Sequence, residues 1–436
     1  MSIGLLSELL SRVAVIGRNL DAARKQPEKS LLTLCQEILD SRGEATGLAH
    51  CQEVLQRYST LSDNQKIEFF VSLLNEFGAD KQALAKAVKA WQEKPDEITA
   101  RALHFIGEPV SQNLLRRINQ VPKATLALVN MRADLLKYTA DSPELKSLDC
   151  DFSHLFSSWF NRGFLELKHI DWETPAAILE KIIAYEAVHE IGSWDSLRQR
   201  VASCDRRLYG YFHPALGIEP LIFVEVALTD HTPRDIKSIL ANDRTQLPAE
   251  QANTAVFYSI SNCQKGLKGI SFGNFLIKQV VENLRHEFPN LDTFVTLSPV
   301  PGFRKWAKKQ STAENSTLSD AQINLVEDLE QAEDTQALLA LTHHNKQLLK
   351  LIAQYLVVSR SAKGGASDPV SRFHLGNGAR LENIHLQGDN SDNGLNNAWG
   401  CMVNYQYKVK DIEKNHEAYI NNDVIIASNK VMGLLK

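Results

Sequence analysis

A glycine-containing loop in the second half of the chain has the clearest spacing for chemistry. It lies between an apolar run at 254–260 and an amphipathic helix predicted from apolar residues four apart: Phe272, Leu276, Val280, Leu284 and Phe288. A second apolar run follows at 291–297. Free N–H groups and the dipole at a helix N-terminus bind anions, often phosphate. The loop 262–269 is therefore predicted to be an anion site within a β-loop-α-β unit.

Three polar side chains beyond this loop are further candidates for a site. Ser298 stands at the carboxyl end of the second apolar run, where α/β sheets usually present ligands, but a serine in this proline-bracketed turn can equally be a cap. His374 lies between two apolar residues, and Tyr407 lies on an alternating segment. From the residues alone, the role of an ordinary core residue is favoured for each of these two. These alternatives stay open.

The elements that must position these residues change in character near Cys150. Residues 1–149 contain helical patterns, sparse glycine and no β runs, which predicts a helical bundle domain. Residues 150–436 add strand patterns at 206–212, 221–228 and 401–409, which predicts an α+β domain with one mixed sheet. The capping box Ser319-x-x-Gln322 belongs to a predicted helical insertion at about 308–358. The segment 359–397 shows little regular pattern apart from a strand near 381–386.

Composition narrows the classes of function. A net charge of −4 argues against a general nucleic-acid binder, and no apolar run is long enough to span a membrane. The six cysteines are scattered without a CxxC pair, which suits a reducing compartment. His189-Glu190 lacks the second histidine of a zinc HExxH motif because Ser193 stands there, so no metal site is predicted. The residues alone indicate a soluble two-domain protein that binds an anionic or phosphorylated ligand.

The chain resembles the malonyl-CoA decarboxylase family in several separate stretches. They occur in the family's order and span nearly the whole second half, and the helical first half fits the family's N-terminal domain in kind. The stretches are WFNRGFL at 159–165, EAVH at 186–189, EPL through VALT at 219–229, FYSIS at 257–261, LSP with PGF at 297–303, and FHL with NGA at 373–379.

The resemblance implies a GNAT-like mixed α/β catalytic domain at 150–436, after a helical oligomerisation domain at 1–149. It implies that Ser298 and His374 carry the reaction, with Tyr407 and Ser259 as polar residues near them. The loop departs from the usual GNAT pattern, because Gly266 replaces Gln or Arg and Ser271 takes the place of the last Gly or Ala. CoA is expected to bind at Lys268, Gly269, Ile270, Ser271, Phe272, Gly273 and Asn274.

The reaction implied by the resemblance is the conversion of malonyl-CoA to acetyl-CoA and CO2 by a carboxy-lyase. It needs no cofactor beyond the CoA of the substrate, because the thioester carbonyl accepts the electrons that CO2 leaves behind. Ser298 is expected to hydrogen-bond the malonyl carboxylate or the thioester oxygen. His374 is expected to deliver the proton, since the ordinary pKa of histidine lies near neutrality.

Two alternatives are a GNAT-type acyltransferase, which would need an amine acceptor, and a non-catalytic CoA-binding protein. The expected partners are malonyl-CoA and acetyl-CoA, with no nucleic acid and no membrane. A homo-oligomer, dimer or tetramer, is expected to form through the helical domain. A cytoplasmic location is expected because the chain ends Leu434-Leu435-Lys436, unlike the Ser-Lys-Leu-like tripeptide of peroxisomal relatives.

Overall fold

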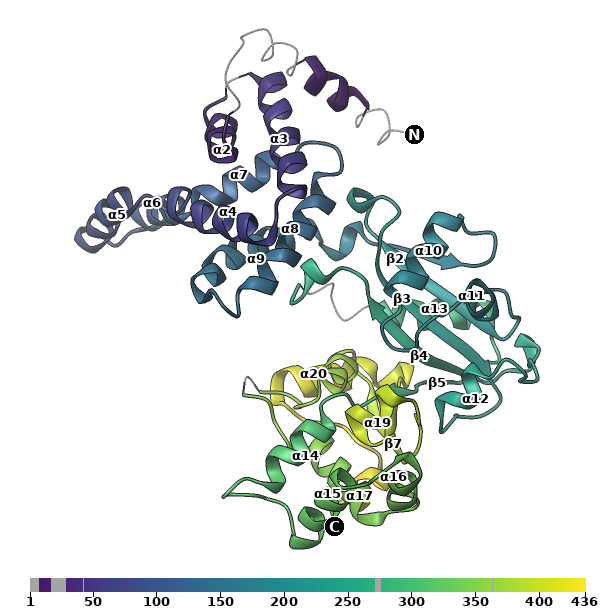
Figure 1. Cartoon of the computed structure of the whole chain (residues 1–436). Helices are drawn as coiled ribbons and strands as arrows, with labels where there is room; N and C mark the ends of the chain where they lie inside the picture. Colours follow the sequence, from purple (N-terminus) through teal and green to yellow (C-terminus); the bar gives the residue numbers. More distant parts are fainter. Residues whose placement is uncertain (1–7, 17–28, 42, 271–275, 363) are drawn as a thin grey trace. The chain divides into compact units, whose positions relative to one another are not determined.

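The computed structural model describes residues 8–16, 29–41, 43–270, 276–362 and 364–436 (Figure 1). The chain divides into two compact units. The first, here called the helical unit, comprises Met1–Glu166 with two segments from the second half, Phe212–Leu221 and Cys263–Phe272. The second, here called the sheet unit, comprises Leu167–Tyr211, Ile222–Asn262 and Gly273–Lys436. The predicted order, a helical region followed by a mixed sheet with helices, is confirmed.

The helical unit consists of amphipathic helices, several of which begin at a polar cap. Ser62 and Gln65 form a capping box at the start of α4, and Asp80 and Asp96 cap α5 and α6. Apolar faces meet in a core with Phe70 at its centre, fully buried. The helices are α2 (Leu31–Asp40), α3 (Glu44–Ser59), α4 (Asp63–Glu76), α5 (Lys81–Glu93), α6 (Glu97–Gly107), α7 (Val110–Ile118), α8 (Ala124–Tyr138) and α9 (Lys146–Trp159).

The sheet unit is built on an eight-stranded mixed sheet in the order β1-β2-β3-β4-β5-β8-β6, with β7 paired to β8. β4 and β5 are parallel and are connected through α13, as the β-loop-α-β pattern predicts. β3 is antiparallel to β4, and β8 is antiparallel to β5, β6 and β7. The strands are β1 (Glu166–Ile170), β2 (Arg206–Phe212), β3 (Pro220–Thr229), β4 (Thr254–Asn262), β5 (Thr293–Thr296), β6 (Ser298–Pro299), β7 (Arg380–His385) and β8 (Met402–Gln406).

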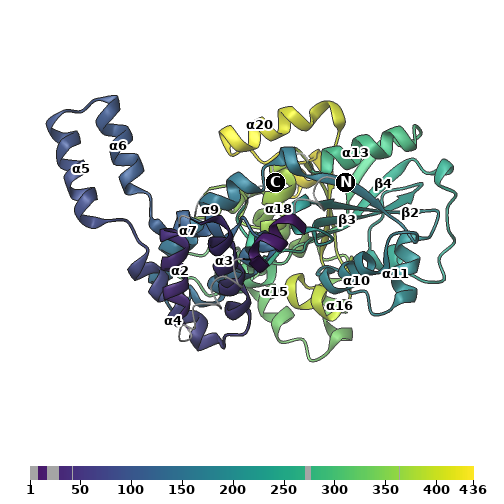
Figure 2. The ribbon, with the colours of Figure 1, turned by 90° about the horizontal axis from the view of Figure 1, so that it is seen from above.

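Helices cover both faces of strands β2 to β4, with α13 on one side and α10 and α11 on the other (Figure 2). The Tyr211 hydroxyl of β2 donates to the Leu276 carbonyl of α13 at 2.6 Å. Within the described ranges, no helix is long and apolar enough to cross a membrane. The helices are α10 (Ala176–Tyr185), α11 (Trp194–Val201), α12 (Ile236–Leu240), α13 (Leu276–Glu287), α14 (Phe303–Ser311), α15 (Asp320–Glu330), α16 (Thr335–Thr342), α17 (Lys346–Ala353), α18 (Pro369–Gly376), α19 (Asp392–Ala398), α20 (Ile412–Asn422) and α21 (Asn429–Gly433).

Two short helices lie where the sequence shows little regular pattern, so that prediction is wrong there. Asp368 caps α18 by accepting from the N–H groups of Val370 and Ser371 at 2.9 and 3.0 Å, and Ser391 caps α19. Segments of eight and seven residues are too short to show a clear apolar period. The sequence does contain a signal, because Asp368 precedes Pro369 in the arrangement typical of a helix start. The error matters because α18 carries His374.

Candidate active site

Ser298, His374 and Tyr407 are far apart in the sequence but form one hydrogen-bonded chain in the sheet unit. Ser298 Oγ lies 3.2 Å from His374 Nε2, and His374 Nδ1 lies 2.8 Å from the Tyr407 hydroxyl. Their exposed fractions are only 5%, 3% and 2%. Ser298 Oγ also donates to Thr296 Oγ1 at 2.8 Å. The structure therefore brings together three of the four residues that the resemblance places at or near the site.

The direction of these hydrogen bonds follows from the number of protons available. A serine hydroxyl has one proton, and Ser298 gives it to Thr296. Ser298 Oγ therefore accepts from Nε2–H of His374. A neutral imidazole carries a single N–H, so His374 Nδ1 accepts from the Tyr407 hydroxyl. The chain runs from Tyr407 through His374 and Ser298 to Thr296.

Burial fixes the charge of this chain. Removal from water lowers the pKa of His374 to about 3, because the protonated ring would lose its hydration. Burial also raises the pKa of Tyr407 well above its ordinary value. Both groups are uncharged at neutral pH. The expectation that His374 acts because its pKa lies near neutrality is therefore wrong.

Strand pairing and ring stacking hold the members of the chain in place. β6 places Ser298 opposite Val403 of β8, and the His374 ring stacks on Tyr405 of the same strand at 4.7 Å between centroids and an angle of 24°. Tyr407 follows β8 directly, and its N–H donates to the Phe294 carbonyl at 2.8 Å. Because side chains alternate along a strand, 403, 405 and 407 share one face. The alternation predicted from the sequence is the feature that brings these residues together.

Asp368 connects the two segments that carry Ser298 and His374. One carboxylate oxygen caps α18, and the other accepts from the Tyr355 hydroxyl at 3.3 Å and from the Gly302 N–H at 3.4 Å. Gly302 lies four residues beyond Ser298, and a Cβ there would lie 2.2 Å from the Tyr355 hydroxyl oxygen. The carboxylate is buried, and this burial raises the pKa of Asp368. The sequence analysis did not single out this residue, although the Asp-Pro pair marks it.

Ser259 is separate from the chain. Its hydroxyl hydrogen-bonds both carboxylate oxygens of Glu186 at 2.9 Å. It lies opposite Glu225 on β3, which is ion-paired with Arg200 at 3.1 Å. A register shift leaves Tyr258 without a partner on β3, so β4 is bulged at this point. Ser259 therefore belongs to a buried acidic cluster rather than to the hydrogen-bonded chain.

The histidine that begins the broken HExxH pattern also lies in the sheet unit. His189 is buried, and burial lowers its pKa. Its backbone N–H donates to the Glu186 carboxylate at 2.7 Å. Among the described residues, no group of three or more His, Cys, Asp and Glu side chains is arranged to hold a metal ion.

The predicted CoA loop lies in the helical unit as far as it is described. A short 3-10 helix, Lys265–Leu267, is followed by the exposed residues Lys268 and Gly269 and by the buried Ile270. Gly269 has a φ of 82°, a left-handed conformation that favours glycine. The other residues predicted to bind CoA, Ser271, Phe272, Gly273 and Asn274, lie outside the described residues.

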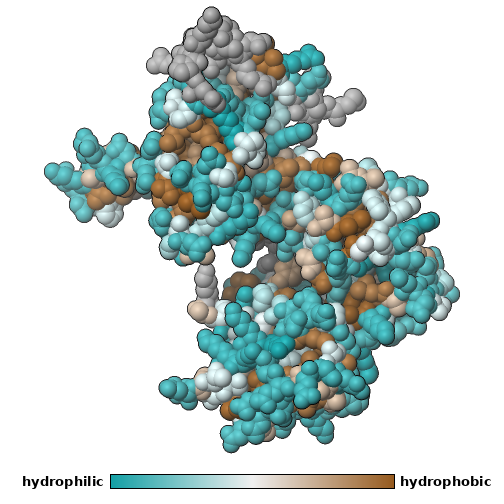
Figure 3. All heavy atoms as spheres, viewed as in Figure 1, coloured by the Kyte–Doolittle hydropathy of each residue, from teal (hydrophilic) through white to brown (hydrophobic). Residues whose placement is uncertain are grey.

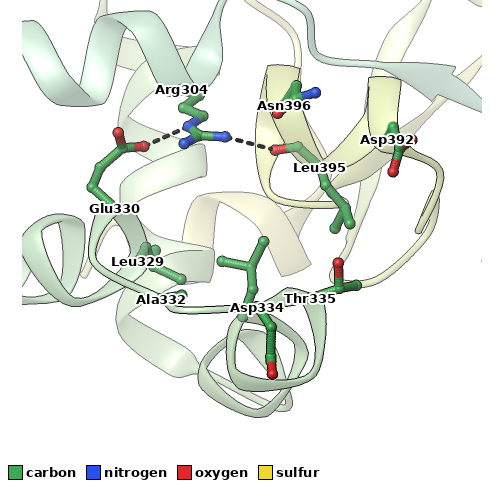
Figure 4. A pocket seen from close by; sticks show the side chains of 10 residues that line it. Arg304, Leu329, Glu330, Ala332, Asp334, Thr335, Asp392, Leu395 and Asn396 are labelled. Atoms are coloured by element: carbon green, nitrogen blue, oxygen red, sulfur yellow. Dashed lines mark hydrogen bonds and ion pairs between the residues drawn. The ribbon is translucent and has the colours of Figure 1, made fainter.

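A hollow of about 190 Å³ in the sheet unit is lined by residues of α14 to α16 and α19, and Ser298, His374 and Tyr407 do not line it (Figure 4). The Arg304 guanidinium reaches the Glu330 carboxylate and the Leu395 carbonyl there. Lys308 pairs with Glu330 at 2.6 Å. Arg304 and Lys308 share the single Glu330 carboxylate, and Asp334 and Asp392 also line the hollow, so the lining offers no net positive charge to an added anion.

Fold and site together define a class of protein: a helical region followed by a domain with a mixed sheet and helices, which holds a buried Ser-His-Tyr chain. Models of the malonyl-CoA decarboxylase C-terminal and N-terminal domains match residues 163–436 and 77–160. The mitochondrial malonyl-CoA decarboxylase of Anser anser anser is 32% identical, in a match that covers 85% of this chain and 80% of that protein. The chain belongs to the malonyl-CoA decarboxylase family.

Solved structures agree with this assignment. The crystal structure of malonyl-CoA decarboxylase from Rhodopseudomonas palustris is 47% identical, with a TM-score of 0.88 over 92% of this chain and 98% of that chain. The one from Agrobacterium vitis is 48% identical, with a TM-score of 0.87 over 94% of this chain and 100% of that chain.

Replacing Asp368 with alanine is predicted to destabilise the sheet unit more than removing another aspartate cap. Asp334→Ala removes one cap bond of α16 and should cost about 1 kcal/mol. Asp368→Ala should cost about 1 kcal/mol for the cap and about 1–3 kcal/mol more for the unpaired Tyr355 hydroxyl. Chemical unfolding of both variants measures the difference. Equal losses would show that the Tyr355 and Gly302 bonds contribute nothing.

Proposed function

We propose that this protein converts malonyl-CoA to acetyl-CoA and CO2. The observation that carries the proposal is the buried, uncharged chain from Tyr407 through His374 to Ser298, in a member of the malonyl-CoA decarboxylase family. Such a chain holds a donor in a dry environment, where hydrogen bonds to a developing oxyanion are strongest. Family membership identifies the substrate, and the hydrogen-bonded Ser-His-Tyr chain provides the groups suited to the reaction.

Decarboxylation breaks the bond between C2 and the carboxylate carbon, and the electron pair passes into the thioester to form an enolate. The thioester carbonyl is the electron sink, so the step needs no further cofactor. In the proposal, the Ser298 hydroxyl turns from Thr296 to an oxygen of the malonyl thioester. There it orients the substrate and stabilises the enolate oxygen.

Protonation at C2 completes the reaction. His374 Nε2–H supplies a proton that reaches C2 through the Ser298 hydroxyl, and the Tyr407 hydroxyl replaces the proton of the ring at Nδ1. The negative charge of the enolate then lies on the chain until water returns a proton to it as acetyl-CoA leaves. The carbon of a thioester enolate is a far stronger base than the usual partners of a histidine. A neutral imidazole is therefore acidic enough to supply this proton, although its pKa excludes a resting imidazolium. Ser259 is proposed to support β4 through Glu186 rather than to meet the substrate.

CoA is proposed to bind at the loop 268–274, of which the described part exposes Lys268 and Gly269. A lysine side chain and a glycine backbone are suited to phosphate because one supplies charge and the other allows close approach. We also propose a domain boundary at 149/150 and a cytoplasmic location. The six free cysteines fit a reducing compartment, and the curated relatives are named as mitochondrial.

A homo-oligomer formed through the helical unit is also proposed. Helices α5 and α6 form a hairpin that projects from the other helices of that unit (Figure 2), and apolar residues reach its surface (Figure 3). Ile98 and Phe105 are 75% and 71% exposed, and Trp91 is 42% exposed. Large apolar side chains so close together on one hairpin favour a contact with another copy of the chain.

Loss of either central side chain is predicted to reduce turnover far more than CoA affinity. Ser298→Ala should lower kcat about 100- to 1,000-fold, and His374→Gln about 100- to 10,000-fold. CO2 and acetyl-CoA release from malonyl-CoA alone, without any acyl acceptor, measures kcat and separates decarboxylation from acyl transfer. Calorimetric titration with CoA measures affinity. Ser311→Ala, at a half-buried position of α14, and His286→Gln, at an exposed position of α13, are the controls. Wild-type turnover in Ser298→Ala or His374→Gln would exclude that residue from the mechanism.

The pH dependence of kcat/KM is predicted to show no bend near pH 6.5 that arises from His374. The pKa of His374 is lowered to about 3, so the ring stays neutral from pH 5 upward. Burial raises the pKa of Glu225 to about 7, so this carboxyl group is expected to titrate near neutrality. Profiles from pH 5 to 9 of the wild type and of Glu225→Gln test this. A loss of activity below about pH 6.5 that persists in Glu225→Gln would contradict a neutral His374.

The lowered pKa of His374 also determines how its contribution to folding stability depends on pH. The folded-state pKa of His374 lies below the unfolded value, so the unfolded chain binds more protons between pH 6.5 and 3. Stability contributed by the neutral ring is therefore present above pH 6.5 and is lost as the pH falls through this window. His374→Gln should make unfolding less dependent on pH there.

Substitution of the exposed apolar residues is predicted to dissociate the oligomer. The double variant Ile98→Ser/Phe105→Ser should sediment as a smaller species than the wild type, because the apolar area that drives association is gone. Ile420→Ser, at a 57% exposed isoleucine of α20, is the matched control. If the double variant and the control sediment alike, this hairpin does not form the contact.

A further inference from the structure

A buried arginine of the helical unit holds the described part of the predicted CoA loop. Arg132 of α8 is 3% exposed, and its Nη1 donates to the Gly266 carbonyl at 2.7 Å and to the Lys268 carbonyl at 3.0 Å. The other side of the guanidinium donates to Asp149 and Ser153 of α9, with Nε 2.7 Å from the carboxylate and Nη2 2.8 Å from the hydroxyl. One side chain therefore joins α8, α9 and the loop.

The backbone of the loop also packs directly on α8. A Cβ added at Gly266 would lie 1.8 Å from the Val129 carbonyl oxygen, which is too close for any side chain. Arg132 and Val129 are three residues apart and so lie on the same face of α8. The loop is thus fixed to this face at two points, by close backbone contact at Gly266 and by the guanidinium at Gly266 and Lys268.

The contact with the Lys268 carbonyl determines where the next N–H points. In a trans peptide the C=O of one residue and the N–H of the next are directed oppositely, and the structure has no cis peptide bond in its described part. Because the Lys268 carbonyl faces Arg132, the Gly269 N–H faces away from it. Gly269 is exposed, and its N–H meets no acceptor among the described residues. An outward N–H at a glycine with positive φ is the kind of donor that binds phosphate oxygens.

We propose that Arg132 is a positioning residue for CoA, which aims the Gly269 N–H at a CoA phosphate without touching the ligand. The part of the proposed CoA loop that Arg132 holds belongs to the helical unit. This inference rests on the proposed CoA-binding loop. It deepens that proposal by assigning the orientation of the loop to a residue more than a hundred positions earlier in the chain.

Arg132 acts through geometry rather than through net charge. Its guanidinium is ion-paired with Asp149, so the pair contributes little net field to an anion. A guanidinium presents five N–H donors in its own plane, directed outward from several edges, whereas an ammonium presents a compact point charge. Lysine at this position keeps the charge but cannot reach two carbonyls, the carboxylate and the Ser153 hydroxyl together. Arg132→Lys therefore keeps the positive charge but removes the contacts that position the loop.

The test compares two substrates, malonyl-CoA and malonyl-pantetheine, which lacks every phosphate. Arg132→Lys should lower kcat/KM for malonyl-CoA roughly tenfold, the size of one hydrogen bond to a charged group, through a higher KM and with kcat nearly unchanged. It should leave kcat/KM for malonyl-pantetheine within about twofold, since no phosphate contact exists to lose. The preference of the enzyme for malonyl-CoA should shrink accordingly.

Arg57→Lys is the matched control, because Arg57 also joins a carboxylate, that of Glu53, to a backbone carbonyl, that of Lys29, within the helical unit. It should leave the preference between the substrates unchanged. Equal losses with both substrates in Arg132→Lys, or no loss with malonyl-CoA, would overturn the proposal. If Arg132→Lys does not fold, Asp149→Asn, which keeps the arginine but loosens it, is measured instead, with a smaller loss expected for malonyl-CoA alone. An unchanged preference in that variant would also overturn it.

The wild type separates this proposal from the one on which it rests. If wild-type protein decarboxylates neither substrate, or uses both equally well, the proposed function or its CoA loop fails. If it prefers malonyl-CoA and Arg132→Lys keeps that preference, only the role of Arg132 fails.

Discussion

A buried, uncharged imidazole needs a hydrogen-bond partner at each ring nitrogen, and the sheet unit is arranged to supply both for His374. Ser298 comes from a two-residue strand and Tyr407 from the residue after β8, and both strands lie in one sheet. An unpaired ring nitrogen at this depth would cost about 1–3 kcal/mol. The short helix α18 must therefore keep its place against β8, and Asp368, Ser371 and Tyr405 maintain it by a cap, a hydroxyl contact and ring stacking.

The sequence could predict the alternation that places Tyr407, because period-two patterns report directly which residues share a face. It predicted Ser298 in a turn after a strand, whereas the structure puts Ser298 on β6, a strand of only two residues. It could not predict α18 from its period, since eight residues give too few turns, and it could not predict the charge of His374. The pKa depends on how much water the whole fold removes from the ring, which is a property of tertiary packing. Ser259 shows the same limit. Ser259 lies on β4, as predicted, but a bulge at Tyr258 changes the face of the sheet to which its side chain points. Its hydroxyl therefore bonds Glu186 rather than the Ser-His-Tyr chain.

A contiguous division of the sequence also misses how the helical unit is completed. The composition changes near Cys150, but the compact helical unit also includes two later segments of the chain, 212–221 and 263–272. The signal that could have revealed the second segment is Arg132 itself, a charged residue on a helix face otherwise made by Leu128, Met131 and Leu135. A buried arginine requires acceptors. For Arg132, these acceptors include the Gly266 and Lys268 carbonyls. A charged residue within an apolar helix face therefore indicates where the loop packs on the helix.

Neutrality of the Ser-His-Tyr chain fits decarboxylation better than a resting imidazolium would. The substrate brings one negative charge, CO2 leaves without it, and the enolate retains it until C2 is protonated. If the proton comes from a neutral chain, the charge passes to the chain and the total in the buried site stays constant through the step. A resting imidazolium would instead pair with the malonyl carboxylate and stabilise the ground state, which raises the barrier to losing CO2. In the proposed mechanism, the burial that lowers the pKa of His374 to about 3 therefore favours the transition state over the bound carboxylate.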